Sequence, residues 1–510
     1  MELLERKYRQ YSILECWAKN GIERVKMKTH TRREVLARLS FILPSTFYSL
    51  NRLSSQRLSA GDSVPIEQQI KSKKGKVSSS SKRNGFGKAK SCIILFAWGG
   101  MSHIDTFDPK PLAPVNYRGE FKPITTKVPG IQISEHLPRL AKRTDSLAII
   151  RSGYHKSSAH GKGMYWNLTG HPPPNPEVAT NQMATSMDYP WIGSVIAKIR
   201  GNHIGRPGCA LLPYPMWDNN TRQGGHDAGW LGRAYDPIIA RPKQGIMYKG
   251  VSREIGTISL ELPQGVSPER SKHRQQLLAD FEQSQFKSVG QAIPTTNSFE
   301  RYRQLANEMM FSKSIQEAFT VEKEEPKIRA SYGNHICGQS VLLARRLTET
   351  GIPLVGVCCA AGDLNGSAGD HWDTHGNNFN RLKNDMLPPF DQAFSALIDD
   401  LKMRGTFEET LVVVLTDFGR TPLINGAAGR DHYPNCFSVI FAGGGIQGGQ
   451  IYGKSDRLGA APLDLGCGPA DFHATIYHAL GIDLDTQISD SFGRPLALTD
   501  GGKVLPLFGS

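Results

Sequence analysis

From residue 91 onward, short apolar runs of strand length alternate with amphipathic helical segments, and this alternation restricts the fold more than any other feature. The runs at 92–96 and 411–415 are continuous in Ile, Leu, Val and Phe, which is typical of strands buried on both faces of a sheet. Further strands are predicted at 146–150, 354–359 and 437–442, and helices at 136–141, 339–348, 390–403 and 470–480. This spacing predicts an α/β fold with a doubly wound, mainly parallel sheet and helices on both faces.

Residues 1–90 differ from the rest of the chain in charge. They hold 20 of the 61 basic and 7 of the 47 acidic residues, so +13 of the formal net charge of +14 lies there. A nearly neutral body does not favour a polyanion, so nucleic acid is not expected as a partner. We interpret 1–90 as a basic leader with a disordered linker, and 91–510 as one α/β domain with a loop-rich excursion at about 172–330.

The leader contains a twin arginine, Arg32 and Arg33, ahead of the modest apolar stretch 41–50. This layout is typical of a twin-arginine export signal at about 27–55 and predicts a periplasmic or cell-envelope protein. Translation from Met27 would fit such a signal better than translation from Met1. The alternative is a basic tail on a cytoplasmic enzyme. No stretch of 18 apolar residues exists, so no transmembrane segment is expected.

Four clusters of acidic residues and histidine punctuate the domain, at 102–105, 372–375, 416–420 and 430–433. The first and third follow predicted strands, and side chains beyond the carboxyl ends of parallel strands converge at one edge of the sheet. Carboxylate and imidazole are ligands for divalent ions. The candidate ligands are Asp373, His375, Asp417 and His432, followed by His103 and Asp105. Zinc is the expected ion, with manganese or calcium as alternatives and one or two ions per chain. Ligand atoms on a shared ion should lie roughly 3–4 Å apart.

Two further residues are candidates for catalysis. His160 precedes the helical segment 164–168 in a Gly-rich stretch, where a helix N-terminus favours an anion, so it is a candidate nucleophile, acid–base group or ligand. Arg420 has a planar guanidinium suited to holding a substrate anion. A buried carboxylate at Asp417 would need a cation or hydrogen bonds, and Arg420 is equally a candidate for that structural role.

Two other patterns carry less weight. The segment 443–449 has G-x-G-x-x-G spacing, but an extended segment follows it where a dinucleotide site requires a helix. The eight cysteines include no C-x-x-C pair, so neither a zinc knuckle nor a disulfide framework is expected.

Together with segments 96–110 (FAWGGMSHIDTFDPK) and 130–138 (GIQISEHLP), these clusters resemble the bacterial family called domain of unknown function 1501, over about 91–510. That family is similar to the alkaline phosphatase and sulfatase superfamily, whose doubly wound sheet holds two divalent ions. The resemblance implies an alkaline-phosphatase-like fold with the four clusters as ligand segments and His160 near the nucleophile position. There are three departures from the superfamily pattern: Gly99-Gly100 in place of paired Asp, Phe418 in place of His, and His160 in place of Ser, Thr or Cys.

The sequence therefore predicts an exported, metal-dependent hydrolase of phosphate or sulfate esters, acting on a small or polymeric anionic substrate. The main alternative is a non-catalytic cell-envelope binding protein that keeps the sulfatase-like fold, which the lost acidic pair favours. Neither the choice between phosphate and sulfate nor the oligomeric state follows from these patterns.

Overall fold

The structure is a computed structural model that describes residues 84–180, 183–201, 206–219, 221–243, 245–249, 266–289, 303, 308–360, 371–490 and 492–509. The predicted twin-arginine signal and most of the predicted linker lie outside these residues. The fold below is that of the unit formed by residues 79–510.

An eight-stranded sheet forms the centre of this unit. Its strands lie in the order β14 (Gln450–Tyr452), β4 (Leu147–Gly153), β13 (Phe437–Ala442), β10 (Thr410–Thr416), β1 (Ser91–Ala97), β9 (Leu354–Cys358), β5 (Ala210–Leu212) and β8 (Ile238–Ile239). β13 runs antiparallel to both of its neighbours, and every other neighbouring pair is parallel. The predicted mainly parallel sheet is confirmed.

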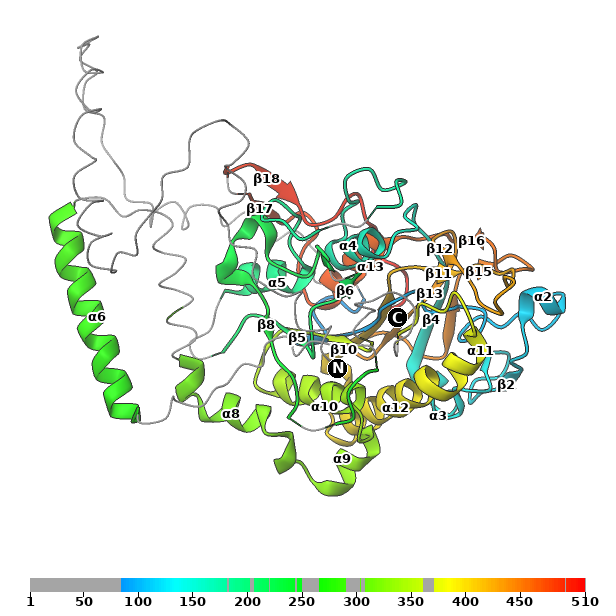
Figure 1. The fold of residues 1–510 in the computed structure, drawn as a ribbon, viewed down its shortest axis with the longest axis horizontal. Coiled ribbons are helices and arrows are strands. Elements are labelled where there is room, and N and C mark those ends of the chain that lie inside the picture. Colours follow the sequence, from blue (N-terminus) through cyan, green and yellow to red (C-terminus); the bar gives the residue numbers. More distant parts are fainter. Residues whose placement is uncertain are drawn as a thin grey trace, which may run out of the picture. The chain divides into compact units, whose positions relative to one another are not determined.

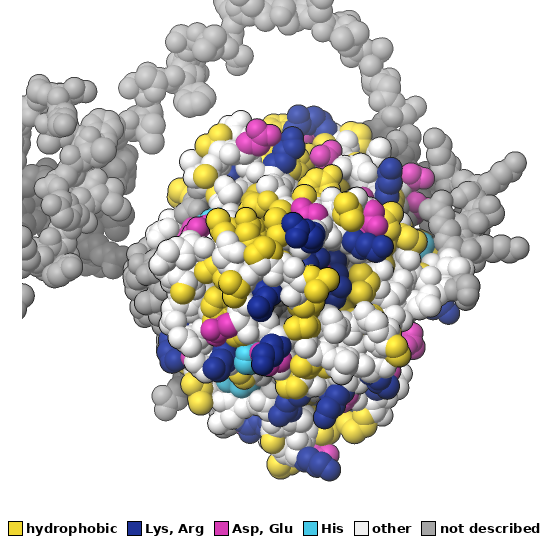
Figure 2. Space-filling view, turned by 90° about the vertical axis from the view of Figure 1, so that its right-hand side faces the viewer, with side chains coloured by type: hydrophobic (Ala, Val, Ile, Leu, Met, Phe, Trp, Pro, Cys, Tyr) yellow, Lys and Arg dark blue, Asp and Glu magenta, His cyan; other side chains and the backbone are white. Residues whose placement is uncertain are grey.

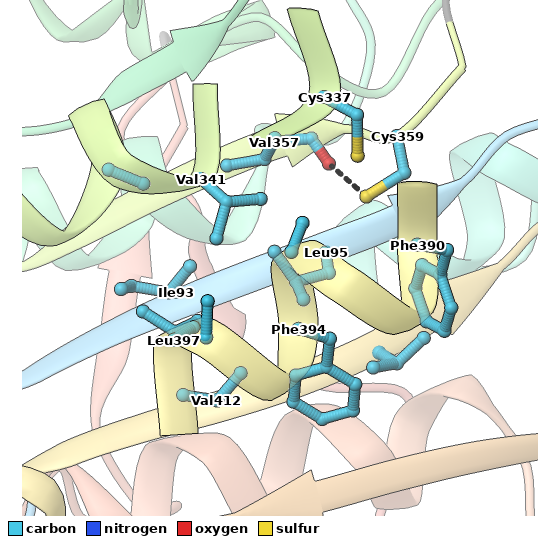
Figure 3. Close-up of a cluster of buried hydrophobic side chains, with 14 of the residues drawn as sticks. Ile93, Leu95, Cys337, Val341, Val357, Cys359, Phe390, Phe394, Leu397 and Val412 are labelled. Carbon is cyan, nitrogen blue, oxygen red and sulfur yellow. Dashed lines mark hydrogen bonds between the residues drawn. The ribbon is translucent and has the colours of Figure 1, made fainter. Parts of the chain in front are cut away.

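Helices cover both faces of the sheet. Helices α10 (Ile336–Glu349) and α12 (Leu387–Met403) lie on one face, and α4 (His160–Thr169), α5 (Ile192–Arg200) and α13 (Pro469–Ala479) cover the other (Figure 1). Successive side chains of β1 alternate between the two cores: Ile93 and Leu95 belong to the first, Cys92 and Ile94 to the second. The first core packs side chains of β1, α10 and α12 together (Figure 3). A strand buried on both faces explains why its sequence is a continuous apolar run.

The remaining elements are short, apart from one long helix. The other helical segments are α2 (Val115–Arg118), α3 (Pro138–Ala141), α6 (Pro268–Val289), α8 (Lys313–Phe319), α9 (Pro326–Tyr332) and α11 (Asn378–Arg381). Two-stranded sheets pair β2 (Pro123–Thr125) with β3 (Gln132–Ser134), β6 (Trp217–Asp218) with β7 (Thr221–Arg222), β11 (Gly419–Arg420) with β12 (His432–Tyr433), β15 (Lys454–Ser455) with β16 (Pro462–Asp464), and β17 (Gln487–Ser489) with β18 (Pro495–Ala497).

The range expected to form an excursion, about 172–330, also contributes to the main sheet. It supplies the edge strands β5 and β8 and the covering helix α5. Strands of three and two residues are too short to give a periodic sequence signal, so their place in the sheet was not predictable.

On the face shown in Figure 2, Lys and Arg side chains are interspersed with hydrophobic and acidic ones. Within the described part of the chain, no helix has the length and hydrophobicity needed to cross a membrane.

Candidate metal centre

The candidate site lies beyond the carboxyl ends of β1 and β10, where the sequence placed it. Asp417 directly follows β10, and Gly99 and Gly100 follow β1 by one residue. His160 is the first residue of α4, so the helix begins four residues earlier than the sequence indicated. His432 belongs to the short strand β12, which pairs with β11, and β11 begins two residues after Asp417.

Asp417 is held entirely by the protein. Its Oδ1 atom accepts the backbone N–H groups of Gly99 and Gly100 at 3.1 and 2.6 Å, and its Oδ2 atom is bonded to Nδ1 of His160. The side chain is 0% exposed. Gly99 has φ +105°, and a Cβ atom there would lie 2.5 Å from the backbone nitrogen of Asp373. Glycine is therefore required at position 99 for this close approach.

Two residues that sequence reasoning missed support the backbone of Asp417. Its carbonyl oxygen lies 2.5 Å from Nε2 of His155 and accepts Nδ2 of Asn167 at 3.2 Å. Nδ1 of His155 accepts the N–H of Ser157 at 3.1 Å, so Nε2 carries the proton and donates. Burial lowers the pKa of His155 to about 4, which keeps this imidazole neutral. No local motif marks either residue, because both act on a segment some 250 residues away in sequence.

Three histidines converge on the carboxylate of Asp373. Nε2 of His375 and Nε2 of His432 lie 3.1 and 3.3 Å from Asp373 Oδ1, and they lie 2.9 Å from each other. Nε2 of His160 lies 3.3 Å from Asp373 Oδ2. The structure thus brings together Asp373, His375, His432 and His160 from three separate segments, with Asp417 directly behind His160.

The other ring nitrogen of each histidine faces a hydrogen-bond acceptor. Nδ1 of His375 lies 2.7 Å from Oδ1 of Asp431, and Nδ1 of His432 lies 2.7 Å from the carbonyl oxygen of Ser158. Nδ1 of His160 meets the Asp417 carboxylate. When the proton of a neutral ring lies on Nδ1 and is donated to this acceptor, Nε2 presents its lone pair toward Asp373.

This arrangement fits a divalent ion. Tetrahedral ligand atoms at about 2.0–2.2 Å from an ion lie roughly 3–4 Å from one another, close to the separations seen here. Among the described residues, His160, Asp373 and His432 offer ligand atoms that all lie within 4.8 Å of one another. Lone pairs gathered around a carboxylate repel one another unless a proton or a cation sits between them. Imidazole with one carboxylate is a donor set suited to zinc.

The charges of the cluster are strongly coupled. Burial opposes the charged form of His160, but Asp373 and Asp417 outweigh it and raise the pKa of this imidazole to about 10. Burial and the nearby charge of His160 lower the pKa of His432 to about 4. Burial works against the charge of Asp373, yet Arg420 and His160 hold its pKa well below the usual value. A proton on His160 thus supplies a positive charge between the two carboxylates.

Arg420 donates hydrogen bonds to four groups of the protein. Its Nη2 atom lies 2.5 Å from Asp373 Oδ1 and also donates to the carbonyl of Gly99, and its Nε and Nη1 atoms donate to the carbonyls of Gly100 and Arg430 at 3.0 Å each. The side chain is 0% exposed. Arg420 therefore orients Asp373. The geometry favours this structural role over holding a substrate anion, and the structural partner is Asp373 where the sequence suggested Asp417.

His103 and Asp105, the remaining predicted ligands, lie outside the cluster. Asp105 forms a fully buried ion pair with Arg430 at 2.8 Å and accepts Ser102 Oγ at 2.6 Å. Nε2 of His103 lies 2.7 Å from the carbonyl oxygen of Gly459. The backbone of Arg430 leads directly into Asp431 and His432, so Asp105 anchors the segment that presents a candidate ligand.

Several solved structures resemble this chain. A phosphonate monoester hydrolase from Silicibacter pomeroyi matches at 14% identity and a TM-score of 0.35, covering 78% of this chain and 74% of its own. The lipoteichoic acid synthase LtaP from Listeria monocytogenes matches at 12% identity and a TM-score of 0.35, covering 82% and 78%. A putative sulfatase from Bacteroides thetaiotaomicron matches at 10% identity and a TM-score of 0.34, covering 82% and 74%.

No curated protein matches the sequence. The family expected from the sequence motifs is confirmed by a direct match. The family described as "Protein of unknown function (DUF1501)" matches residues 89–507, and the chain therefore belongs to the DUF1501 family.

Proposed function

We propose that this protein is an exported, zinc-dependent hydrolase of phosphate or sulfate esters. One observation carries the proposal: the Nε2 atoms of His375 and His432 lie 2.9 Å apart beside the Asp373 carboxylate, while the Nδ1 atom of each faces an acceptor. Such second contacts fix the tautomer of metal-binding histidines. The substrate class rests on the resemblance that the sequence motifs carry.

The residues of the cluster would share the work as follows. Asp373, His375, His432 and His160 would hold one ion, which when bound polarises an ester oxygen and lowers the pKa of a water molecule. Arg420 fixes the carboxylate of Asp373, and Asp417 fixes the ring of His160 through Nδ1. The side chain of His375 is 46% exposed, so the cluster opens to solvent on that side and a substrate would enter there.

A screen for turnover tests this proposal. The purified full chain is assayed with zinc, manganese or calcium on an aryl phosphate monoester, an aryl phosphodiester and an aryl sulfate. We expect metal-dependent hydrolysis of at least one ester, a loss of at least about 100-fold in His432→Ala, and little change in the control His103→Gln. Hydrolysis that survives both a chelator and His432→Ala would contradict the proposal.

A non-catalytic binding protein is the second candidate, and the hydrogen bonds accepted by the Asp417 carboxylate favour it. Backbone amides bind one oxygen of this carboxylate and His160 binds the other, which disfavours a second ion at Asp417. A protein that binds one zinc ion per chain but turns over none of the three esters would fit this candidate better.

The export part of the proposal rests on Arg32 and Arg33 in the leader. Because the twin-arginine signal is read by a receptor, replacing both with lysine should trap the precursor in the cytoplasm at unchanged hydrophobicity. Unchanged fractionation of this double variant would remove export from the proposal and leave the hydrolase untouched.

A further inference from the structure

Three buried cysteines meet where α10 begins and β9 ends. Cys337 is the second residue of α10, Cys358 is the last residue of β9, and Cys359 follows it. α10 packs against β9, and the thiols of Cys337 and Cys359 point toward one another across this contact (Figure 3). The Cys359 thiol also donates to the carbonyl of Val357 at 3.9 Å.

The alternation of side chains along β9 selects which cysteine faces Cys337. Neighbouring residues of an extended segment point to opposite faces of a sheet. Cys358 belongs to the second core, and its thiol donates to the carbonyl of Ala360. Cys359 and Cys337 both belong to the first core, under α10 and α12. Cys359 therefore faces Cys337, and Cys358 is directed away from it.

We propose that Cys337 and Cys359 are an oxidisable pair that forms a disulfide when the chain meets a disulfide oxidant, either glutathione disulfide or a protein dithiol oxidase. The two thiols lose two protons and two electrons as the S–S bond forms, and the disulfide of the oxidant is reduced to two thiols. The bond ties the start of α10 to the end of β9. This inference is independent of the proposed hydrolase activity.

The surroundings of the pair predict when the bond forms. The neighbouring Cys337 thiol, together with burial, holds the pKa of the Cys359 thiol well above its usual value. Since the thiolate is the attacking species, the folded and reduced pair reacts slowly, and oxidation proceeds while the chain folds or opens. Once formed, the bond restrains the unfolded chain between the two cysteines and stabilises the fold.

Peptide mapping without reduction tests the pairing. The full-length protein is incubated with glutathione disulfide under mildly destabilising conditions, alkylated after denaturation and digested with trypsin. Cleavage after Arg329, Arg345, Arg346 and Arg381 places Cys337 in one peptide and both Cys358 and Cys359 in another. We expect these two peptides to be cross-linked, and we expect the oxidised protein to melt about 3 °C higher than the reduced protein.

Cys358→Ser and Cys359→Ser form a matched pair of variants at adjacent positions. The cross-link should persist in Cys358→Ser and disappear in Cys359→Ser, whose melting temperature should no longer respond to reductant. If Cys359→Ser fails to fold, the map of Cys358→Ser still decides, because only Cys359 then remains in the second peptide. Absence of the cross-link in the wild type after this incubation, or its survival in Cys359→Ser, would overturn the proposal.

Discussion

Two clusters of acidic residues and histidine, one around Asp105 and one around Asp373, lie at the same edge of the sheet. They differ in the partners of their charged groups. Around Asp105, every charge has a partner: the carboxylate accepts Arg430 Nε at 2.8 Å, Ser102 Oγ at 2.6 Å and Asn378 Nδ2 at 3.0 Å. The carboxylate of Asp373 also has a buried cation as partner, Arg420 at 2.5 Å, but three imidazole nitrogens face it in addition. The first region is a closed ion pair, and the second has the features of a ligand set.

The difference shows that strand-end position alone does not identify a metal ligand. Residue type and strand order predict which side chains gather at the edge of the sheet. Whether a carboxylate is free to bind an ion depends on donors supplied by distant segments, as Arg430 shows for Asp105. The two regions should therefore respond differently to mutation, to metal and to pH.

The largest effect is expected from breaking the closed region. Asp105→Ala would leave the buried guanidinium of Arg430 without its counterion, and the free energy of unfolding should fall by about 3–5 kcal/mol. Chemical denaturation measures this change. Asp431→Ala is the control, since its side chain is 51% exposed and its loss should cost less than about 1 kcal/mol in the metal-free protein. Equal losses in the two variants would remove the distinction between the regions.

Removing a ligand from the open region should reduce metal affinity. In His432→Ala we expect zinc affinity to fall by about 100-fold or more, which exceeds the 10–100-fold typical of an outer partner. The variant should nevertheless fold, because His432 pairs with no buried charge other than Asp373, and Asp373 keeps Arg420. Calorimetric titration with zinc measures the affinity, and an unchanged dissociation constant would mean that His432 is not a ligand.

The pH dependence of binding should follow the protonation of His160. Its pKa of about 10 means that the metal-free protein carries a proton there at neutral pH, which zinc must displace. The affinity should therefore rise about tenfold per pH unit near pH 7–9, with about one proton released per ion. Titration in two buffers of different ionisation enthalpy counts that proton, and a count of zero would exclude His160 as a ligand.

The raised pKa of His160 also predicts how the stability of the fold depends on pH. Because the folded pKa of His160 lies above the unfolded value near 6.5, its contribution is fully present below pH 6.5 and is lost as the pH rises through about 10. His155 has the opposite sign: its pKa of about 4 makes the fold less stable as the pH falls from about 6.5 to 4. Five residues apart in sequence, the two histidines should limit stability at opposite ends of the pH range.

Much of the fold was predictable because the sheet has strong local signals. The continuous apolar runs at 92–96, 411–415 and 437–442 became β1, β10 and β13 within one or two residues at each end. Asp373, His375 and His432 lie close together, as expected for side chains at the carboxyl edge of the sheet. The support from His155, the ion pair of Asp105 and the true partner of Arg420 were not predictable, since each depends on contacts between segments far apart in the sequence.

The smallest effect concerns an outer partner of the open region. Asp431→Asn keeps an acceptor oxygen near Nδ1 of His375 but removes the charge that favours this tautomer. We expect zinc affinity to fall about tenfold, less than in His432→Ala, with no change in the stability of the metal-free protein beyond about 0.5 kcal/mol. A loss as large as that of His432→Ala would indicate that Asp431 itself binds the ion.

The zinc content of the purified full-length protein after dialysis tests the central distinction most directly. Elemental analysis should give one zinc ion per chain for the wild type and for His103→Gln, and almost none for His432→Ala, because the ligand set lies around Asp373 and excludes the region of Asp105. A wild type without stoichiometric zinc, or a His432→Ala variant that retains it while His103→Gln does not, would contradict the account.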